Sequence, residues 1–265
     1  MPLFAARIVD NREIADDYLE LSFAWEGPKP QPGQFFTVRV ANGPAPLLRR
    51  PFGFSGYTTT DGQVTASTIY RRRGPATRLM AGRKPDESIE ILGPLGTPFP
   101  EPRDAASPLL VAGGVGVGPI LYLADELAAR GRPATLIIGA RSTADLPRRI
   151  PAEGTELFYT TDDGSFGERG TSIDLLQRLV SERMKQGSDL ELFLCGPEPM
   201  LEAGYRLAQR LGISAWVAME QTMGCAVGAC MGCAIPLAGS NKYARVCTEG
   251  PVFDAATIDW ESLRA

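Results

Sequence analysis

Four of the five cysteines gather near the C-terminus, and their spacing restricts the possible fold more than any other feature of the sequence. Cys225, Cys230, Cys233 and Cys247 form the pattern Cys-x4-Cys-x2-Cys-x13-Cys. Three thiolates from one curled loop and a fourth from a later segment are the ligands of a plant-type [2Fe–2S] cluster. Glycines within the loop allow tight turns that aim backbone N–H groups at sulfur. The spacing therefore predicts a [2Fe–2S] cluster bound by these four cysteines.

Other uses of the four cysteines stay open as alternatives. A structural zinc site usually takes its ligands from two closely spaced pairs, and the second pair is missing here. A [4Fe–4S] centre more often shows a Cys-x2-Cys-x2-Cys run that ends in Cys-Pro. Disulfides would leave the glycine density of the loop unexplained. The [2Fe–2S] interpretation accounts for both the spacing and the glycines.

The composition excludes several classes of site. The 265 residues include no histidine, which removes the Ser-His-Asp triad, most zinc enzymes and a Rieske centre. A formal charge of -4 and a pI near 5.1 give no basic footprint for nucleic acid. No apolar stretch reaches the roughly 18 residues of a membrane-spanning helix, and residues 1–10 show no signal-peptide pattern. We therefore expect a cytoplasmic protein with neither a nucleic-acid nor a membrane partner.

The hydrophobic pattern divides the chain into three parts. Residues 1–102 carry short apolar runs separated by Pro- and Gly-rich turns, which predicts a small antiparallel β-barrel with one helix over 76–81. In residues 103–215 strands alternate with helices, which predicts a nucleotide-binding parallel sheet covered on both faces. Residues 216–265 form a C-terminal extension that holds the cysteines. The expected strands lie at 4–9, 18–23, 35–40, 64–70, 88–92, 109–112, 134–139, 157–160 and 190–194, and the later helices at 120–130, 171–185 and 199–211.

Two motifs of the α/β part indicate a nucleotide. The strand at 109–112 runs into a glycine-rich turn over 113–119, where backbone N–H groups can approach a pyrophosphate; a tight structural turn is the alternative. The pair Cys195-Gly196 lies at the carboxyl end of a later strand, where open α/β sheets bind ligands. A buried hydrophobe is the alternative for Cys195. The predicted contacts are Gly113, Gly114, Gly116, Cys195 and Gly196.

Three short strings of the barrel part suit a flavin nucleotide. Arg50-Pro51-Phe52-Gly53 combines a guanidinium, which can bind phosphate, with an aromatic surface for a planar ring. Ile69-Tyr70-Arg71 and Ala76-Thr77 could add a second phosphate cradle. An ordinary solvated arginine pair before a strand is the alternative interpretation of the first string. On this basis the flavin would contact Arg50, Pro51, Phe52, Gly53, Ile69, Tyr70, Arg71, Ala76 and Thr77.

Together the motifs resemble the ferredoxin-reductase superfamily, in which a flavin barrel precedes a Gly-Gly-x-Gly turn and a Cys-Gly-Pro-x-Pro-Met string. With the cysteine extension, the chain resembles the electron-transfer subunits of NAD-using dihydroorotate dehydrogenases over about residues 8–247. The string Thr161-Asp162-Asp163-Gly164-Ser165-Phe166-Gly167 and Glu220 also match. The resemblance implies FAD on the barrel and NAD on the α/β part. Gly53 replaces the serine of the family's flavin motif, with Ser55 two residues further, and Ala76-Thr77 replaces a Gly-Thr pair.

The resemblance also implies a function. A partner subunit containing FMN would oxidise dihydroorotate in pyrimidine biosynthesis, in a heterotetramer of two chain types. Electrons would pass through the cluster to FAD and leave as hydride to NAD⁺, because flavin exchanges both single electrons and hydride. A subunit of a hydrogenase or of an NADH-dependent ferredoxin:NADP reductase complex is the nearest alternative, and a cluster-based redox sensor is a more distant one. Arg141 and Ser142 leave the choice between NAD and NADP open.

Overall fold

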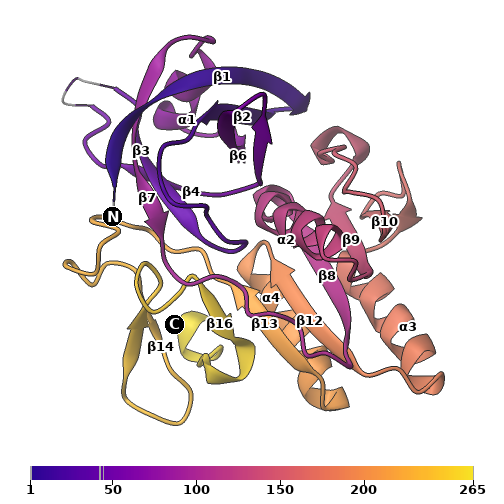
Figure 1. Ribbon diagram of the computed structural model, residues 1–265. Coiled ribbons are helices and arrows are strands. Elements are labelled where there is room, and N and C mark those ends of the chain that lie inside the picture. Colours follow the sequence, from indigo (N-terminus) through magenta and orange to yellow (C-terminus); the bar gives the residue numbers. More distant parts are fainter. Residues whose placement is uncertain (1, 42, 44, 265) are drawn as a thin grey trace.

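The computed structural model describes residues 2–41, 43 and 45–264, and its first part is a seven-stranded antiparallel sheet that curls into a barrel (Figure 1). The strand order is β4-β3-β7-β1-β2-β6-β5. The helix α1 (Pro75–Ala81) lies between β6 and β7 in the sequence. The strands are β1 (Leu3–Ala15), β2 (Tyr18–Ala24), β3 (Phe35–Arg39), β4 (Arg50–Gly53), β5 (Gly56–Thr60), β6 (Gln63–Arg71) and β7 (Ser88–Leu95).

The barrel closes around an aromatic core. Phe23, Phe36 and Phe54 are fully buried, and Phe36 lies 5.1 Å from Phe23 and 4.8 Å from Phe54 between ring centroids. Burial of rings of this size dominates the stability of a small barrel. The hydrophobic pattern predicts five of the seven strands. It misses β4, which contains a proline and a glycine and lies at one end of the strand order, and β5, which is mostly exposed threonine.

The second part is a sheet with strand order β11-β10-β9-β8-β12-β13-β16, parallel except for β16. One core packs α2 against one face of the sheet, and a second core packs α3 and α4 against the other. The predicted fold class is therefore confirmed. The elements are β8 (Ser107–Gly113), the 3-10 turn η1 (Gly114–Gly116), α2 (Val117–Ala129), β9 (Ala134–Ala140), η2 (Thr143–Asp145), β10 (Thr155–Thr161), β11 (Glu168–Arg169), α3 (Ser172–Lys185), β12 (Leu190–Cys195), α4 (Glu198–Leu211) and β13 (Ser214–Ala218).

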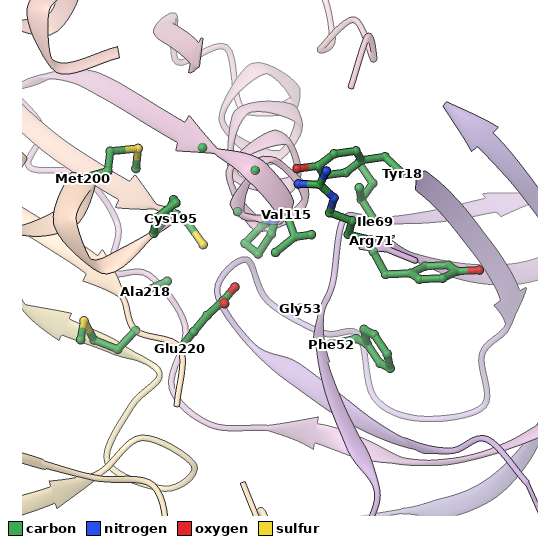
Figure 2. Close-up of a pocket in the computed structure, with 18 of the residues that line it drawn as sticks. Tyr18, Phe52, Gly53, Ile69, Arg71, Val115, Cys195, Met200, Ala218 and Glu220 are labelled. Carbon is green, nitrogen blue, oxygen red and sulfur yellow. The ribbon is translucent and has the colours of Figure 1, made fainter. Parts of the chain in front are cut away.

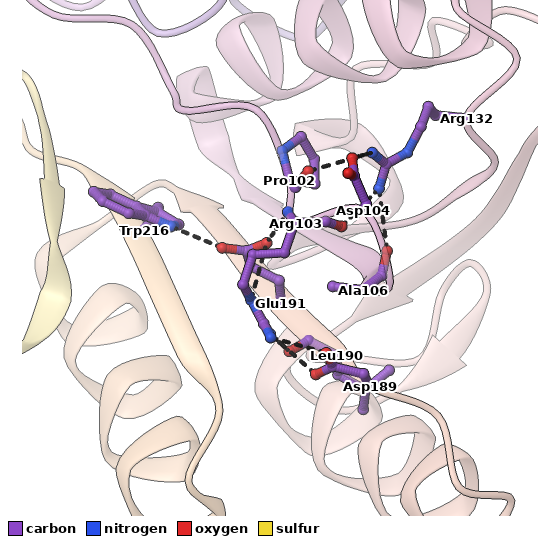
Figure 3. Close-up of polar contacts among 9 residues, drawn as sticks. All are labelled: Pro102, Arg103, Asp104, Ala106, Arg132, Asp189, Leu190, Glu191 and Trp216. Atoms are coloured by element: carbon purple, nitrogen blue, oxygen red, sulfur yellow. Dashed lines mark hydrogen bonds and ion pairs between the residues drawn. The ribbon is translucent and has the colours of Figure 1, made fainter.

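The segment that joins the two parts is fixed at the amino ends of the parallel strands (Figure 3). The buried Glu191 carboxylate accepts the backbone N–H of Arg103 at 2.8 Å and the indole N–H of Trp216 at 3.1 Å. Arg103 also donates to both oxygens of Asp189, at 2.8 and 3.0 Å. A buried carboxylate needs such partners to offset its lost hydration. The linker is thus fixed at the edge of the sheet opposite the carboxyl ends of the parallel strands.

Polar contacts also join the barrel to the α/β part directly. The Tyr122 hydroxyl on α2 donates to the buried carbonyl of Pro30 at 2.6 Å. Arg149 donates to the carbonyl of Ser55 at 2.7 Å and to Asp125 at 2.8 Å. Because these bonds are partly or fully shielded from water, they hold the two parts in one relative orientation.

The C-terminal part is continuous with the second sheet rather than a separate appendage. It contains β14 (Ala234–Pro236), β15 (Tyr243–Arg245), β16 (Val252–Asp254), η3 (Ala255–Thr257) and η4 (Ser262–Arg264). β16 pairs with β13 in antiparallel register, with Val217 opposite Phe253. The proposed boundary at residue 216 falls inside β13, and the three-part division stays a prediction. No helix in the described part of the chain is long and apolar enough to cross a membrane.

Candidate functional site

A cavity of about 770 Å³ lies between the barrel and the carboxyl ends of the parallel strands. Figure 2 shows Phe52 and Arg71 of the barrel on one side and Cys195 and Glu220 on the other. The fold brings twelve of the predicted site residues to this one cavity, although their roles in binding stay predictions. They are Pro51, Phe52, Gly53, Ile69, Tyr70, Arg71, Thr77, Gly113, Gly114, Gly116, Cys195 and Gly196.

The barrel wall of the cavity is aromatic, and the Arg71 guanidinium lies beside it. The rings of Phe52 and Tyr70 meet edge to face with centroids 6.0 Å apart. The Tyr70 hydroxyl donates to Asn11 at 2.9 Å, and burial raises the pKa of Tyr70 to about 12, so the phenol stays neutral. The Arg71 guanidinium lies 5.1 Å from the centre of the Tyr18 ring. An apolar wall beside a guanidinium suits a planar ring attached to a phosphate.

Two predicted flavin contacts, Arg50 and Ala76, do not line the cavity. The Arg50 guanidinium turns back and donates to the carbonyl of Leu48 at 2.8 Å, and Ala76 is buried in the barrel core. Their neighbour Thr77 does line it. The Thr77 hydroxyl accepts the N–H of Gly74 at 3.0 Å at the first turn of α1. The proposed phosphate cradle at α1 therefore depends on Thr77 rather than on Ala76.

Gly53 lies where the barrel contacts α2. A Cβ at this position would lie 2.7 Å from the ring of Pro119, at the start of α2, which is closer than real Cβ contacts. Ser55 does not replace the missing serine, because it is fully buried and its hydroxyl lies 2.9 Å from that of Ser67. The carbonyl of Gly53 accepts the Thr68 hydroxyl at 2.7 Å. The carbonyl of Gly53 is therefore already used within the barrel.

The glycine turn after β8 leaves no room for a side chain at Gly113 or Gly116. A Cβ on Gly116 would collide with the carbonyl of Cys195, and one on Gly113 would lie 2.8 Å from the sulfur of Met200. Gly114 has a φ of +57°, which favours glycine. Because η1 leads directly into α2, the turn places free backbone and a helix N-terminus at the cavity, an arrangement that binds phosphate groups.

Cys195 and Glu220 line the cavity on the side away from Phe52 and Arg71 (Figure 2). Burial raises the pKa of the Cys195 thiol well above its ordinary value, and the nearby Glu220 adds to this, so Cys195 is not a nucleophile. Protein atoms surround the Glu220 carboxylate although it is open to the cavity, and this desolvation raises its pKa. A neutral thiol at a strand end fits the contact surface of a planar ring.

Several cavity residues were not predicted from the sequence. Tyr18 precedes the motif strings by a long stretch of sequence, and only the β2–β6 pairing places it beside Arg71. Ala218 could have been found, because it ends β13 at the edge where Cys195 ends β12. Met200 belongs to the same string as Cys195. The additional lining residues include Tyr18, Val115, Met200, Ala218 and Met219.

A small hairpin brings the last two cysteines together. Cys233 directly precedes β14 and Cys247 follows β15, and the antiparallel register pairs Ala234 with Arg245. The N–H of Val246 donates to the carbonyl of Cys233 at 3.1 Å. Both thiols are buried. The long gap in the cysteine spacing is therefore the length of a hairpin that returns the chain to its start.

The loop that carries the first two cysteines directs backbone N–H groups toward the sulfur of Cys225. Cys225 Sγ accepts N–H groups of Val227, Ala229 and Cys230 at 3.5, 3.2 and 3.4 Å. These bonds lower the pKa of the Cys225 thiol to about 6, which favours the thiolate that iron requires. Ala226 adopts a φ of +59°, a strained conformation that tends to occur where a site demands it.

The donor set therefore fits a [2Fe–2S] cluster: four thiols, curled backbone, and N–H groups aimed at sulfur. Arg245 supports the loop by donating to the carbonyl of Gly228 at 2.8 Å. Within residues 2–41, 43 and 45–264 no three potential ligands converge as a site for a single metal ion. The cluster assignment rests on the spacing and the loop geometry.

Comparisons with known proteins decide the family. The chain is 37% identical over 262 residues to the dihydroorotate dehydrogenase B (NAD(+)) electron transfer subunit of Geobacillus thermodenitrificans, covering 95% of this chain and 96% of that one. The subunit of Bacillus caldolyticus is 40% identical over 234 residues, with 86% of each chain covered. This chain belongs to that family. The family resemblance and the electron-transfer function predicted from the sequence are thus confirmed.

The cluster segment of this family member matches separately. Residues 220–259 match the family model described as the iron–sulfur cluster binding domain of dihydroorotate dehydrogenase B, and this range contains all four predicted ligands. The chain is thus an oxidoreductase subunit with an iron–sulfur segment. The assignment of each cysteine as a ligand stays a prediction.

Solved structures agree with this family membership. An NADH-dependent reduced ferredoxin–NADP oxidoreductase superposes with a TM-score of 0.84 at 26% identity, covering 98% of this chain and 91% of that one. A ferredoxin NADP+ reductase from Neisseria gonorrhoeae with bound FAD and NADP superposes with a TM-score of 0.64 at 16% identity, covering 79% and 92%. The second likeness shows the fold of the barrel and α/β parts.

Proposed function

We propose that this chain passes electrons between an FMN-containing dihydroorotate dehydrogenase catalytic subunit and NAD⁺, with FAD in the central cavity and a [2Fe–2S] cluster on the cysteine loop. The names of the relatives support the partner and the dinucleotide, and the fold supports the flavin. When bound, a flavin exchanges hydride with nicotinamide and single electrons with an iron–sulfur cluster. Assembly as a heterotetramer and a cytoplasmic location are part of the proposal.

One observation carries this proposal: the cavity and the cysteine loop are directly continuous. Met223 lines the cavity, and Cys225 follows two residues later. Two residues span at most about 7 Å, so the first cysteine lies beside the cavity wall. A ring bound in the cavity would therefore sit within a short distance of a group held by the loop.

The residues of the chain have distinct roles in this function. The barrel wall at Phe52 and Tyr70 would hold the flavin ring and exclude water from it. The glycine turn would hold the dinucleotide pyrophosphate through backbone N–H groups. The strand ends at Cys195 and Ala218 would form the surface for the nicotinamide ring. One proton is taken up with each pair of electrons that the flavin receives from the cluster, and in a chain without histidine this proton would come from water or from a group other than imidazole.

The test is anaerobic reduction of the purified chain, reconstituted with FAD and cluster, by NADH in a stopped-flow instrument. We expect NADH to bleach the flavin absorbance and the cluster to give the electron paramagnetic resonance signal of a reduced [2Fe–2S] centre. This diaphorase-type reaction should proceed without the partner, whereas dihydroorotate should reduce the flavin only when the partner is present. Absence of any NADH-dependent reduction would contradict the proposal.

A second candidate function follows from the structural comparison. The NADH-dependent ferredoxin–NADP oxidoreductase matches 98% of this chain, so a subunit of such a complex has the same outline. The dihydroorotate family is favoured because its members reach 37 to 40% identity, against 26% for that structure. Purification of the native complex separates the candidates, because only the first would contain a dihydroorotate-oxidising partner. A redox sensor would not turn over with NADH.

A further inference from the structure

The loop after β10 carries two adjacent aspartates that do different things. The Asp163 carboxylate accepts the N–H of Ser165 at 2.9 Å and its hydroxyl at 2.6 Å, and these bonds lower the pKa of Asp163. Asp162 instead lines the central cavity. Among the described residues its carboxylate has no hydrogen-bond or ion-pair partner. The Asp163 carboxylate thus shapes the loop, whereas the Asp162 carboxylate can bind a ligand in the cavity.

The loop is built to hold Asp162 in place. The Thr161 hydroxyl bonds both the N–H and the carbonyl of Phe166, at 3.0 and 2.8 Å. The Ser165 hydroxyl accepts the N–H of Thr143 at 2.8 Å, which ties the loop to η2. Gly167 has a φ of +68° and contacts the carbonyl of Tyr159 so closely that no Cβ would fit. These contacts restrict the loop to one conformation.

The position of Asp162 along the sheet edge can be followed through the strand register. Cys195 at the end of β12 is opposite Ala112 on β8, Gly113 is opposite Gly139 on β9, and Ala140 on β9 is opposite Thr161 on β10. Three strand spacings separate β12 from β10, which is about 14 Å. This distance is comparable to the length of an extended dinucleotide. With nicotinamide at Cys195 and pyrophosphate at the glycine turn, the adenosine ribose reaches Asp162.

The charged groups at this end of the cavity leave no excess positive charge for an additional phosphate. Arg141 is the cation at the end of β9, and its guanidinium lies 3.8 Å from Asp145, which also pairs with Arg71 at 2.8 Å. Together Arg71, Arg141, Asp145 and Asp162 carry two positive and two negative charges, so the carboxylates balance the guanidinium groups. The nearby N-terminus of α3 is already capped, because Thr171 accepts the N–H of Asp174. Hydroxyl groups suit this environment better than a phosphate dianion.

We infer that Asp162 selects NAD(H) over NADP(H), by accepting hydrogen bonds from the hydroxyls of the adenosine ribose and repelling a 2′-phosphate. This inference rests on the proposed function, since it requires a nicotinamide dinucleotide at the sheet edge. Asp162 acts on binding only, and the hydride transfer takes place at the other end of the dinucleotide. The adjacent Asp163 has the same charge but no access to the ligand.

The test compares Asp162→Asn with Asp163→Asn in the reconstituted protein. Both substitutions remove one negative charge, and an asparagine side chain in place of Asp163 would keep the acceptor oxygen for Ser165. We expect D162N to raise KM for NADH about tenfold and to lower KM for NADPH about tenfold, with kcat for NADH unchanged, because ribose hydrogen bonds are lost and repulsion is relieved. D163N should leave the NADH to NADPH preference within about twofold of wild type.

Binding measured without turnover gives an independent result. Calorimetric titration with ADP-ribose and with 2′-phospho-ADP-ribose should show the same change of preference in D162N. If wild type is reduced by NADH and D162N keeps its preference, the inference is overturned and the proposed function stands. If neither dinucleotide reduces wild type, the proposed function is overturned and the inference with it. A second substitution, Asp162→Ser, should change the preference in the same direction as D162N.

Discussion

The cysteine segment and the central cavity are both sites for cofactors, but they are built in opposite ways. The four cysteines lie within one short stretch, and local backbone bonds and one hairpin bring them together. The cavity takes its wall from many short stretches spread between Tyr18 and Pro251, and these stretches lie far apart in sequence. One site is a local loop, and the other is an interface.

This difference decides how each site should respond to change. A loop whose ligands supply the binding energy is sensitive to loss of any single ligand and tolerant of changes elsewhere. A cavity between two packed parts is sensitive to added side-chain volume, because close packing holds the barrel against the α/β part. The following substitutions test this contrast.

Loss of one cysteine should have the largest effect. We expect Cys233→Ala to reduce bound iron from about two atoms per chain to near zero, because the cluster needs four thiolates. Electron transfer to the partner should be lost, while NADH reduction of the flavin should persist. Iron analysis and visible absorbance measure the first effect, and stopped-flow reduction measures the second. Cys195→Ala should keep its full iron content; equal iron loss in both variants would remove the distinction between the sites.

A methyl group at Gly116 should be the most damaging small change in the cavity. Its Cβ would collide with the carbonyl of Cys195, and backbone cannot easily yield. We expect Gly116→Ala to lower the free energy of unfolding by about 3 kcal/mol. Denaturant titration of the flavin-free protein measures this. Gly82→Ala is the matched control. Gly82 has a helical φ of -80°, and a Cβ there would lie 3.6 Å from the nearest atom, the carbonyl oxygen of Leu79. We expect this substitution to be neutral or slightly stabilising.

Restoring the family serine at position 53 should weaken flavin binding rather than strengthen it. The added side chain would meet Pro119 at 2.7 Å and push the barrel away from α2. We expect Gly53→Ser to cost about 1–2 kcal/mol of flavin binding energy, measured by fluorescence titration. In a double-mutant cycle, Pro119→Ala should recover part of the loss. Tighter flavin binding by G53S alone would show that the two walls are not in rigid contact.

The smallest expected effect concerns Glu220 and pH. Burial raises the pKa of Glu220, so folding favours its protonated form. This stabilising contribution is fully present below the ordinary glutamate pKa and is lost as pH rises through the folded-state value. Glu220→Gln stays neutral, and we expect its melting temperature relative to wild type to increase between about pH 5 and pH 8. A constant difference across this range would place the carboxylate in water rather than among protein atoms.

Prediction from the sequence was most specific where a structure is local. The cysteine spacing, the glycine turn after β8 and the strand end at Cys195 each lie within a short string whose chemistry is set by neighbouring residues. The alternation of strands and helices also predicted the second sheet, because buried strands and amphipathic helices leave different hydrophobic periods. β4 and β5 were missed since neither carries such a period.

The amino-acid sequence specifies which groups are available: five thiols, four of them at cluster spacing, a glycine-rich turn, and no imidazole anywhere. Their positions around the cavity depend on the tertiary fold. It excluded Arg50 and Ala76 from the cavity wall, turned Ser55 toward Ser67, and separated Asp162 from Asp163. These outcomes depend on strand register and on contacts between distant elements, which a linear pattern does not encode. The spacing of residues along the chain sets the local backbone geometry. Packing between distant elements sets which side chains point into the cavity.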